Sequence, residues 1–123
     1  MVCHAGNFSI NTFIPAIIDS INPSLISFAS GVVAGVALES HLRKLAEKNS
    51  IPIITDEWKY INADSLNGEL RKKGILDKTL NKSITSWLGL RNDAAHPDAK
   101  EINEGLIESM IAGIKVFIEK FPA

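Results

Sequence analysis

The stretch "LNKSITSWLGLRNDAAHPD" (residues 80–98) has the spacing of an amphipathic helix that ends at a proline. Leu80, Ile84 and Trp87 recur at i, i+4 and i+7, which places them on one apolar face. Arg91 continues that face for one more turn, and His96 follows five residues later. The buried face of this helix therefore ends in charged and polar side chains, which need a specific environment.

Arg91 points within roughly 20° of the mean direction of the apolar face, at 100° per residue, so we expect it to face a seam between helices. Three environments fit this position: the protein surface, an ion pair with Glu39, or a site that binds an anion. Pro97 ends the helix near His96, which allows the imidazole to turn back toward the guanidinium. Ala94 beside them leaves room for a second backbone or a nucleotide.

The rest of the chain shows further helical patterns, and strand patterns are nearly absent. Asp64 and Asp77 are expected N-caps, and Gly74 is an expected helix stop. The last helix begins at either Asp98 or Asn103. The predicted helices are 9–20, 24–49, 65–73, 78–95 and a final one that runs to about residue 120. We therefore predict an all-α fold, an antiparallel up-and-down bundle of four core helices plus a short N-terminal helical segment.

Two segments qualify this prediction. The segment "IPIIT" (51–55) is the one strand candidate, and Pro52 weakens it. Residues 21–38 carry no charge and contain a Gly31-xxx-Gly35 spacing. Because serines, an asparagine and a proline interrupt this run, we interpret it as a buried helix that another helix approaches closely, and not as a membrane span.

Composition indicates one domain of 123 residues with a net charge of −1 and 46% apolar residues. This balance argues against a dedicated electrostatic nucleic-acid binder. Residues 59–91 nevertheless carry seven basic and three acidic side chains, an excess that fits either solvated helix faces or phosphate contacts. The single cysteine, Cys3, excludes an internal disulfide and favours the cytoplasm. We expect no metal and no other cofactor.

The segment "RNDAAH" (91–96) resembles the signature of the HEPN superfamily, small all-helical domains of prokaryotic toxin–antitoxin, phage-defence and RNA-processing systems. The segments "AGVALESHLRKLAEK" (34–48), "LNGELRKKGILDKTL" (66–80), "ITSWLGLRNDAAHP" (84–97) and "MIAGIKVFIEKF" (110–121) follow in the order of one such domain. The resemblance divides the chain into an N-terminal helical segment, 1–22, and a HEPN-like helical domain, 23–123.

The resemblance implies a homodimer about the helix that carries the motif, and a metal-independent endoribonuclease. His96 would act on the ribose 2′-hydroxyl, and Arg91 would stabilise the charge that develops on the phosphate oxygens. Asn92 would orient the phosphate, and Glu39 is a candidate for orienting Arg91. These residue types suit the reaction, because it needs a base that titrates near neutrality and a permanent positive charge.

Several alternatives stay open at this stage. In a purely structural interpretation, Arg91 pairs with Glu39 or Asp93, and His96 caps carbonyls at the end of the helix. HEPN-like domains also serve as non-catalytic dimerisation or nucleotide-binding modules for protein interactions. The expected partners are a second copy, RNA, and an antitoxin or other protein, with no membrane. We place His41 and Arg43 on a solvated helix face. The two tryptophans are interpreted as packing residues and not as base-stacking platforms.

Overall fold

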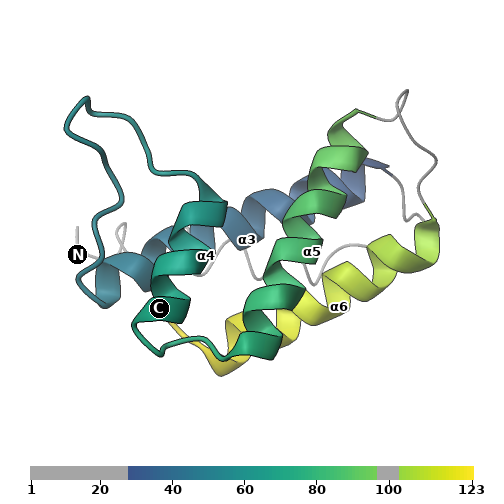
Figure 1. Ribbon diagram of the computed structural model, residues 1–123. Helices are drawn as coiled ribbons and strands as arrows, with labels where there is room; N and C mark the ends of the chain where they lie inside the picture. The colour runs from purple at the N-terminus through teal and green to yellow at the C-terminus, as the bar shows by residue number, and fades with distance from the viewer. Residues whose placement is uncertain (1–27, 97–102) are drawn as a thin grey trace, which may run out of the picture.

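The computed structural model describes residues 28–96 and 103–123, which form four helices and no strand (Figure 1). The helices are α3 (Phe28–Lys48), α4 (Ala63–Lys72), α5 (Lys78–Ala95) and α6 (Glu104–Lys120). The predicted all-α fold with four core helices is therefore confirmed. The expected N-terminal helix, in 1–22, lies outside the described residues.

The helices do not simply alternate in direction along the chain. α3 and α5 are antiparallel, because Gly31 faces Ala94 and Gly35 faces Arg91. α3 and α6 run the same way, since Gly31 also lies near Ile107 while residues near the far ends of both helices meet (Figure 1). The long connection 49–62 makes this order possible, because α4 does not have to turn straight back along α3, as it would after a short loop.

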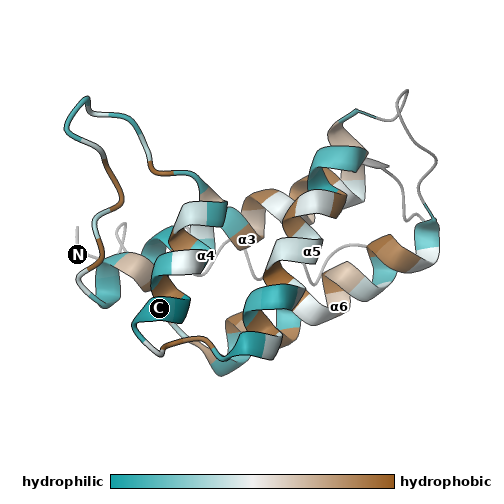
Figure 2. Cartoon of the chain, viewed as in Figure 1, coloured by the Kyte–Doolittle hydropathy of each residue, from teal (hydrophilic) through white to brown (hydrophobic). Residues whose placement is uncertain are grey.

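All four helices contribute to one apolar core (Figure 2). Its largest fully buried apolar side chains are Leu38, Leu42, Leu66, Leu70, Leu76, Ile84, Ile107, Met110, Ile114 and Phe117. Within the described ranges, no helix is long and apolar enough to cross a membrane.

The ends of the helices follow local signals. The Asp77 carboxylate accepts a hydrogen bond from the Leu80 backbone N–H (2.7 Å), so α5 begins as predicted. α4 begins two residues earlier than predicted. Its N-cap is Asn62 and not Asp64, because the side chain of Asn62 accepts a hydrogen bond from the Ser65 N–H. Of the two predicted starts for the last helix, the structure shows Asn103 as the N-cap.

The two glycines of α3 allow the close approach of α5 that their spacing predicts. A Cβ atom at Gly31 would lie 3.1 Å from the Cβ of Ala94, and a Cβ at Gly35 would overlap the side chain of Arg91. The backbone of α3 is therefore the surface on which Arg91 rests. The absence of a side chain at Gly35 decides where the arginine can lie.

Candidate functional site

Arg91 lies in the seam between α5 and α3, as its helical position predicts. Its side chain is 22% exposed, and its terminal nitrogen Nη2 lies 3.1 Å from Oε2 of Glu39. Of the three environments considered for this arginine, the ion pair with Glu39 is the one observed. Both side chains are thereby fixed against the middle of α3.

Glu39 binds a second arginine with its other oxygen. Arg43, one turn further along α3, places Nη2 3.3 Å from Oε1 of Glu39. The Arg43 guanidinium also lies over the ring of Tyr60, with its central carbon 4.5 Å from the ring centroid. A continuous row of contacts therefore leads from Arg91 through Glu39 and Arg43 to Tyr60. We call these four residues the arginine row.

The arginine row carries more positive charge than its carboxylate neutralises. Two guanidinium groups share one carboxylate, and the Nε atoms of both Arg43 and Arg91 are buried without a hydrogen-bond partner. Buried N–H donors of arginine are normally satisfied. Because these Nε atoms are buried, an acidic ligand would meet only the partly exposed remainder of each guanidinium, a planar group that phosphate oxygens match.

His96 stands at the C-cap of α5, where its backbone N–H donates to the Asp93 carbonyl (3.2 Å). Its side chain is exposed, and so is that of Asn92. Asn92 lies on an exposed face of α5 with the small residues Ser86 and Gly89, and His96 follows directly after the end of the helix. Within the described residues no hydrogen bond joins His96 to Arg91, because the Arg91 side chain points to α3. A single chain therefore holds Arg91 and His96 at the same end of α5, with Arg91 turned to α3 and His96 exposed.

His41 is not on a solvated face, so that prediction is wrong. It is 9% exposed, its Nε2 donates to the Phe121 carbonyl (2.6 Å), and its ring meets Phe117 edge-on at 5.3 Å. Burial lowers the pKa of His41 below its usual value, and the hydrogen bond to Phe121 partly opposes this effect. The spacing from Leu38 and Leu45, three and four residues away, indicated this position on the apolar face. Arg43 also differs from the predicted solvated face, because its side chain is partly buried.

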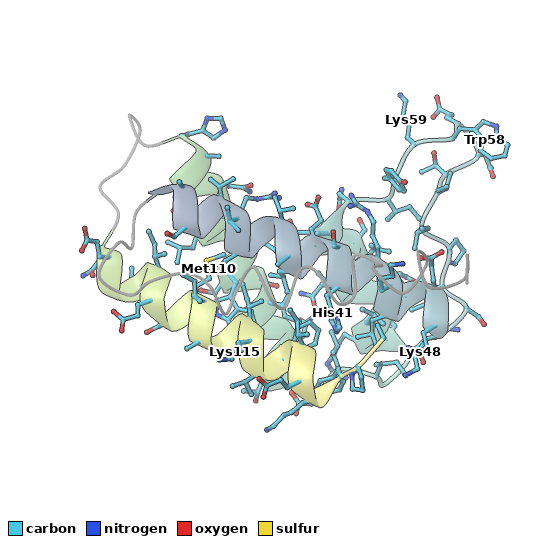
Figure 3. The ribbon with its side chains drawn as sticks, turned by 180° about the vertical axis from the view of Figure 1, so that it is seen from behind. His41, Lys48, Trp58, Lys59, Met110 and Lys115 are labelled. Carbon is cyan, nitrogen blue, oxygen red and sulfur yellow. The ribbon has the colours of Figure 1, made fainter. Side chains whose placement is uncertain are left out.

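The two tryptophans differ in their environment. Trp87 is half-buried against Gly113, as a packing residue should be. Trp58 is 85% exposed, and Figure 3 shows it beside Lys59 at the far end of the connection between α3 and α4. The packing interpretation of Trp58 is therefore wrong. Its position in a loop left no periodicity from which exposure could be judged.

Other features of the described residues add no second site of this kind. Residues 28–96 and 103–123 contain no group of three His, Cys, Asp or Glu side chains placed to hold a metal ion. The strand candidate 51–55 forms only one bridge, between Ile54 and Tyr60. Pro52 removes a backbone donor, so a longer ladder is not available.

Comparisons of the chain with protein-family models, with curated proteins and with solved structures give no match. The resemblance to the HEPN superfamily therefore rests on the residues of this chain and on their order.

Proposed function

We propose that this chain is a HEPN-like domain that acts as a metal-independent endoribonuclease, in a toxin–antitoxin or phage-defence setting. The observation that carries the proposal is the end of α5, where Arg91 is held by Glu39 and His96 is exposed on the same helix. A permanent cation and an imidazole that accepts a proton are the two groups that this reaction requires.

In the proposed reaction, His96 takes the proton of a ribose 2′-hydroxyl. The 2′-oxygen forms a bond to the adjacent phosphorus, and the bond from phosphorus to the 5′-oxygen breaks. The products are a 2′,3′-cyclic phosphate and a 5′-hydroxyl, whose oxygen takes up a proton. Arg91 stabilises the negative charge on the phosphate oxygens, and Asn92 orients the phosphate.

A homodimer about α5 would complete this site. Asn92 shares an exposed face of α5 with Ser86 and Gly89, whose small size permits close approach of a second α5, and His96 is exposed at the end of this helix. A Cβ atom at Gly89 would meet nothing within 4 Å in the single chain, so this face has space for a partner. Two copies would bring two histidines together, while each Arg91 stays in the neighbouring seam between its own α5 and α3.

The test is cleavage of mixed RNA by the purified protein in excess EDTA, followed by analysis of the new ends. We expect cyclic-phosphate ends from the wild type. His96→Ala should reduce the rate by roughly 10²–10⁴-fold, the usual contribution of a general base. Arg91→Ala should reduce it by roughly 10²–10³-fold, as for loss of a group that stabilises developing charge.

Two matched variants control for general effects on folding and charge. Arg71→Ala removes an exposed arginine from α4, and Lys120→Ala removes an exposed cation from α6. Both should cleave RNA at the wild-type rate. Cleavage that is equal in all variants would assign the activity to a contaminant and contradict the proposal.

The second candidate function is a non-catalytic HEPN-like module that binds a nucleotide or a protein such as an antitoxin. The observation that favours it is the ion pair itself, because Glu39 already neutralises part of the Arg91 charge. A folded, dimeric protein that binds RNA or nucleotide without cleaving it would select this alternative. In that case Arg91→Ala should weaken binding and His96→Ala should not.

A further inference from the structure

The connection between α3 and α4 contains a loop closed by hydrogen bonds, residues 53–61, which we call the aromatic loop. Figure 1 shows it projecting away from the helices. Backbone hydrogen bonds close it, from Ile61 N–H to the Ile53 carbonyl (2.8 Å) and from Thr55 N–H to the Lys59 carbonyl (2.8 Å). The Trp58 N–H donates to the Thr55 carbonyl (2.9 Å), so the backbone of the tip is also fixed.

The aromatic loop presents apolar side chains to solvent at a conformational cost. Trp58 is 85% exposed, Tyr60 is 64% exposed and Ile54 is 41% exposed. The φ of Trp58 is 61°, in the left-handed region that glycine adopts without strain. A large aromatic residue in this conformation, with almost no burial in return, is explained better by a contact outside this chain than by folding.

Basic side chains lie at the base of the same loop. Tyr60 and Ile54 line a hollow of ≈ 440 Å³ against α3, together with two cations, Arg43 and Lys44, and one carboxylate, Glu47. The Arg43 guanidinium covers one face of the Tyr60 ring, while the ring stays largely exposed. Aromatic rings beside cations are the combination that binds single-stranded nucleic acid, with bases on the rings and phosphates on the cations.

The loop is also connected to the candidate site. Arg43 shares the Glu39 carboxylate with Arg91, so the contacts of the arginine row run from α5 to Tyr60 without a break. A strand of RNA whose phosphate lies at Arg91 could therefore continue along α3 to the loop. Asp56 and Glu57 at the tip disfavour phosphate there, which assigns the bases to the tip and the phosphates to Arg43 and Lys44.

We propose that the aromatic loop is a stacking platform for unpaired bases, with Trp58 and Tyr60 as its two rings, and that it selects single-stranded RNA. This inference rests on the proposed ribonuclease function for the direction of the strand toward Arg91. The specific contribution of the loop is binding of the substrate and not the chemical step.

The test is binding of a fluorescein-labelled 12-nucleotide RNA in which every ribose carries a 2′-O-methyl group. This probe lacks the attacking hydroxyl, so it reports binding whether or not the protein cleaves RNA. Fluorescence anisotropy should show a dissociation constant that rises roughly 5–150-fold in Trp58→Ala, the usual effect of losing one base-stacking ring. Tyr60→Ala should raise it by a similar factor, and Trp58→Phe should retain most of the affinity.

Leu106→Ala is the matched control, because it removes another exposed apolar side chain, 57% exposed, from α6. It should leave the dissociation constant unchanged. A 12-base-pair duplex of the same chemistry should bind with no dependence on Trp58, because its bases are already stacked. Circular dichroism and thermal unfolding of each variant establish that the fold is retained.

Two results would overturn the inference. One is equal affinity of the wild type and of Trp58→Ala for the single-stranded probe, which would indicate a protein partner for the loop. The other is no binding of the probe by any variant. Failure of the ribonuclease proposal gives a different result, since the probe would then still bind through Trp58 while unmodified RNA stays intact.

Discussion

Two residues other than glycine adopt left-handed backbone conformations in the described chain, Ser50 and Trp58. Ser50 follows α3 in a helix-ending motif in which the Ile51 N–H donates to the Ala46 carbonyl (2.8 Å). α4 ends in the same motif, with Gly74 at the equivalent position and a φ of 78°. The two helix ends therefore share one backbone motif, but only the end of α3 has a residue with a side chain, Ser50, in the left-handed conformation.

Ser50→Gly should stabilise the protein by about 0.5–1 kcal/mol, because glycine adopts the left-handed conformation without a clash of its Cβ. Gly74→Ser should destabilise it by about the same amount for the same reason. Chemical denaturation of the two variants measures both changes in the free energy of unfolding.

Ser86→Gly is the control, because Ser86 is an exposed residue within α5. Glycine there should lower stability by about 0.5 kcal/mol through loss of helix propensity. A destabilised Ser50→Gly variant would show that the serine side chain makes a contribution larger than the backbone cost.

At the scale of the elements, the pairing of α3 with α5 depends on Gly35. Because a Cβ at this position would overlap Arg91, Gly35→Ala must displace the arginine or separate the two helices. We expect a loss of about 1–3 kcal/mol in the free energy of unfolding, the usual cost of overpacking. Cleavage of RNA should fall as well, since Arg91 would leave its place beside Glu39.

Gly68→Ala is the matched substitution in α4, where a Cβ would meet nothing within 4 Å. It should stabilise the protein by about 0.5–1 kcal/mol, the difference between alanine and glycine in a helix. Equal effects of the two substitutions, measured by thermal and chemical unfolding, would contradict the role assigned to Gly35.

The elements also differ in how well the sequence predicts them. The bounds of α5 follow from its Asp77 cap and its proline, both local signals, and the approach of α5 to Gly31 and Gly35 follows from their spacing. The ion pair between Arg91 and Glu39 could be named because both residues face the same seam. By contrast, the shared direction of α3 and α6 depends on the path of the connection 49–62, and no local pattern encodes it.

At the scale of the whole molecule, the C-terminal end is fastened to α3. The buried His41 donates to the Phe121 carbonyl, and the Lys48 ammonium donates to the Pro122 carbonyl (2.9 Å). Since a carbonyl only accepts, Nε2 of His41 carries the proton, and the neutral ring is sufficient for this contact. Protonation would place a charge in a largely apolar environment, against Phe117.

Stability should therefore depend on pH through His41. Its pKa is lowered in the folded state, so the unfolded chain binds the proton more readily as the pH falls below about 6.5. The stabilisation is complete above that pH and is lost progressively as the pH falls toward the lowered pKa. Thermal unfolding between pH 7.5 and 5 should show this decrease in the melting temperature.

His41→Gln should remove this part of the pH dependence, whereas His96→Ala, at an exposed position, should retain it. A wild-type melting temperature that does not change between pH 7.5 and 5 would contradict the assignment.

The projection of the aromatic loop has a consequence for proteolysis. Lys59 is exposed near its tip, so trypsin has access to the chain there, at a place remote from the apolar core. A single cut would separate α3 from α4, α5 and α6, yet the contacts that join α3 to α5 and α6 do not pass through the loop. The nicked protein should then behave as a complex of two fragments, each of which supplies half of the ion pair between Glu39 and Arg91.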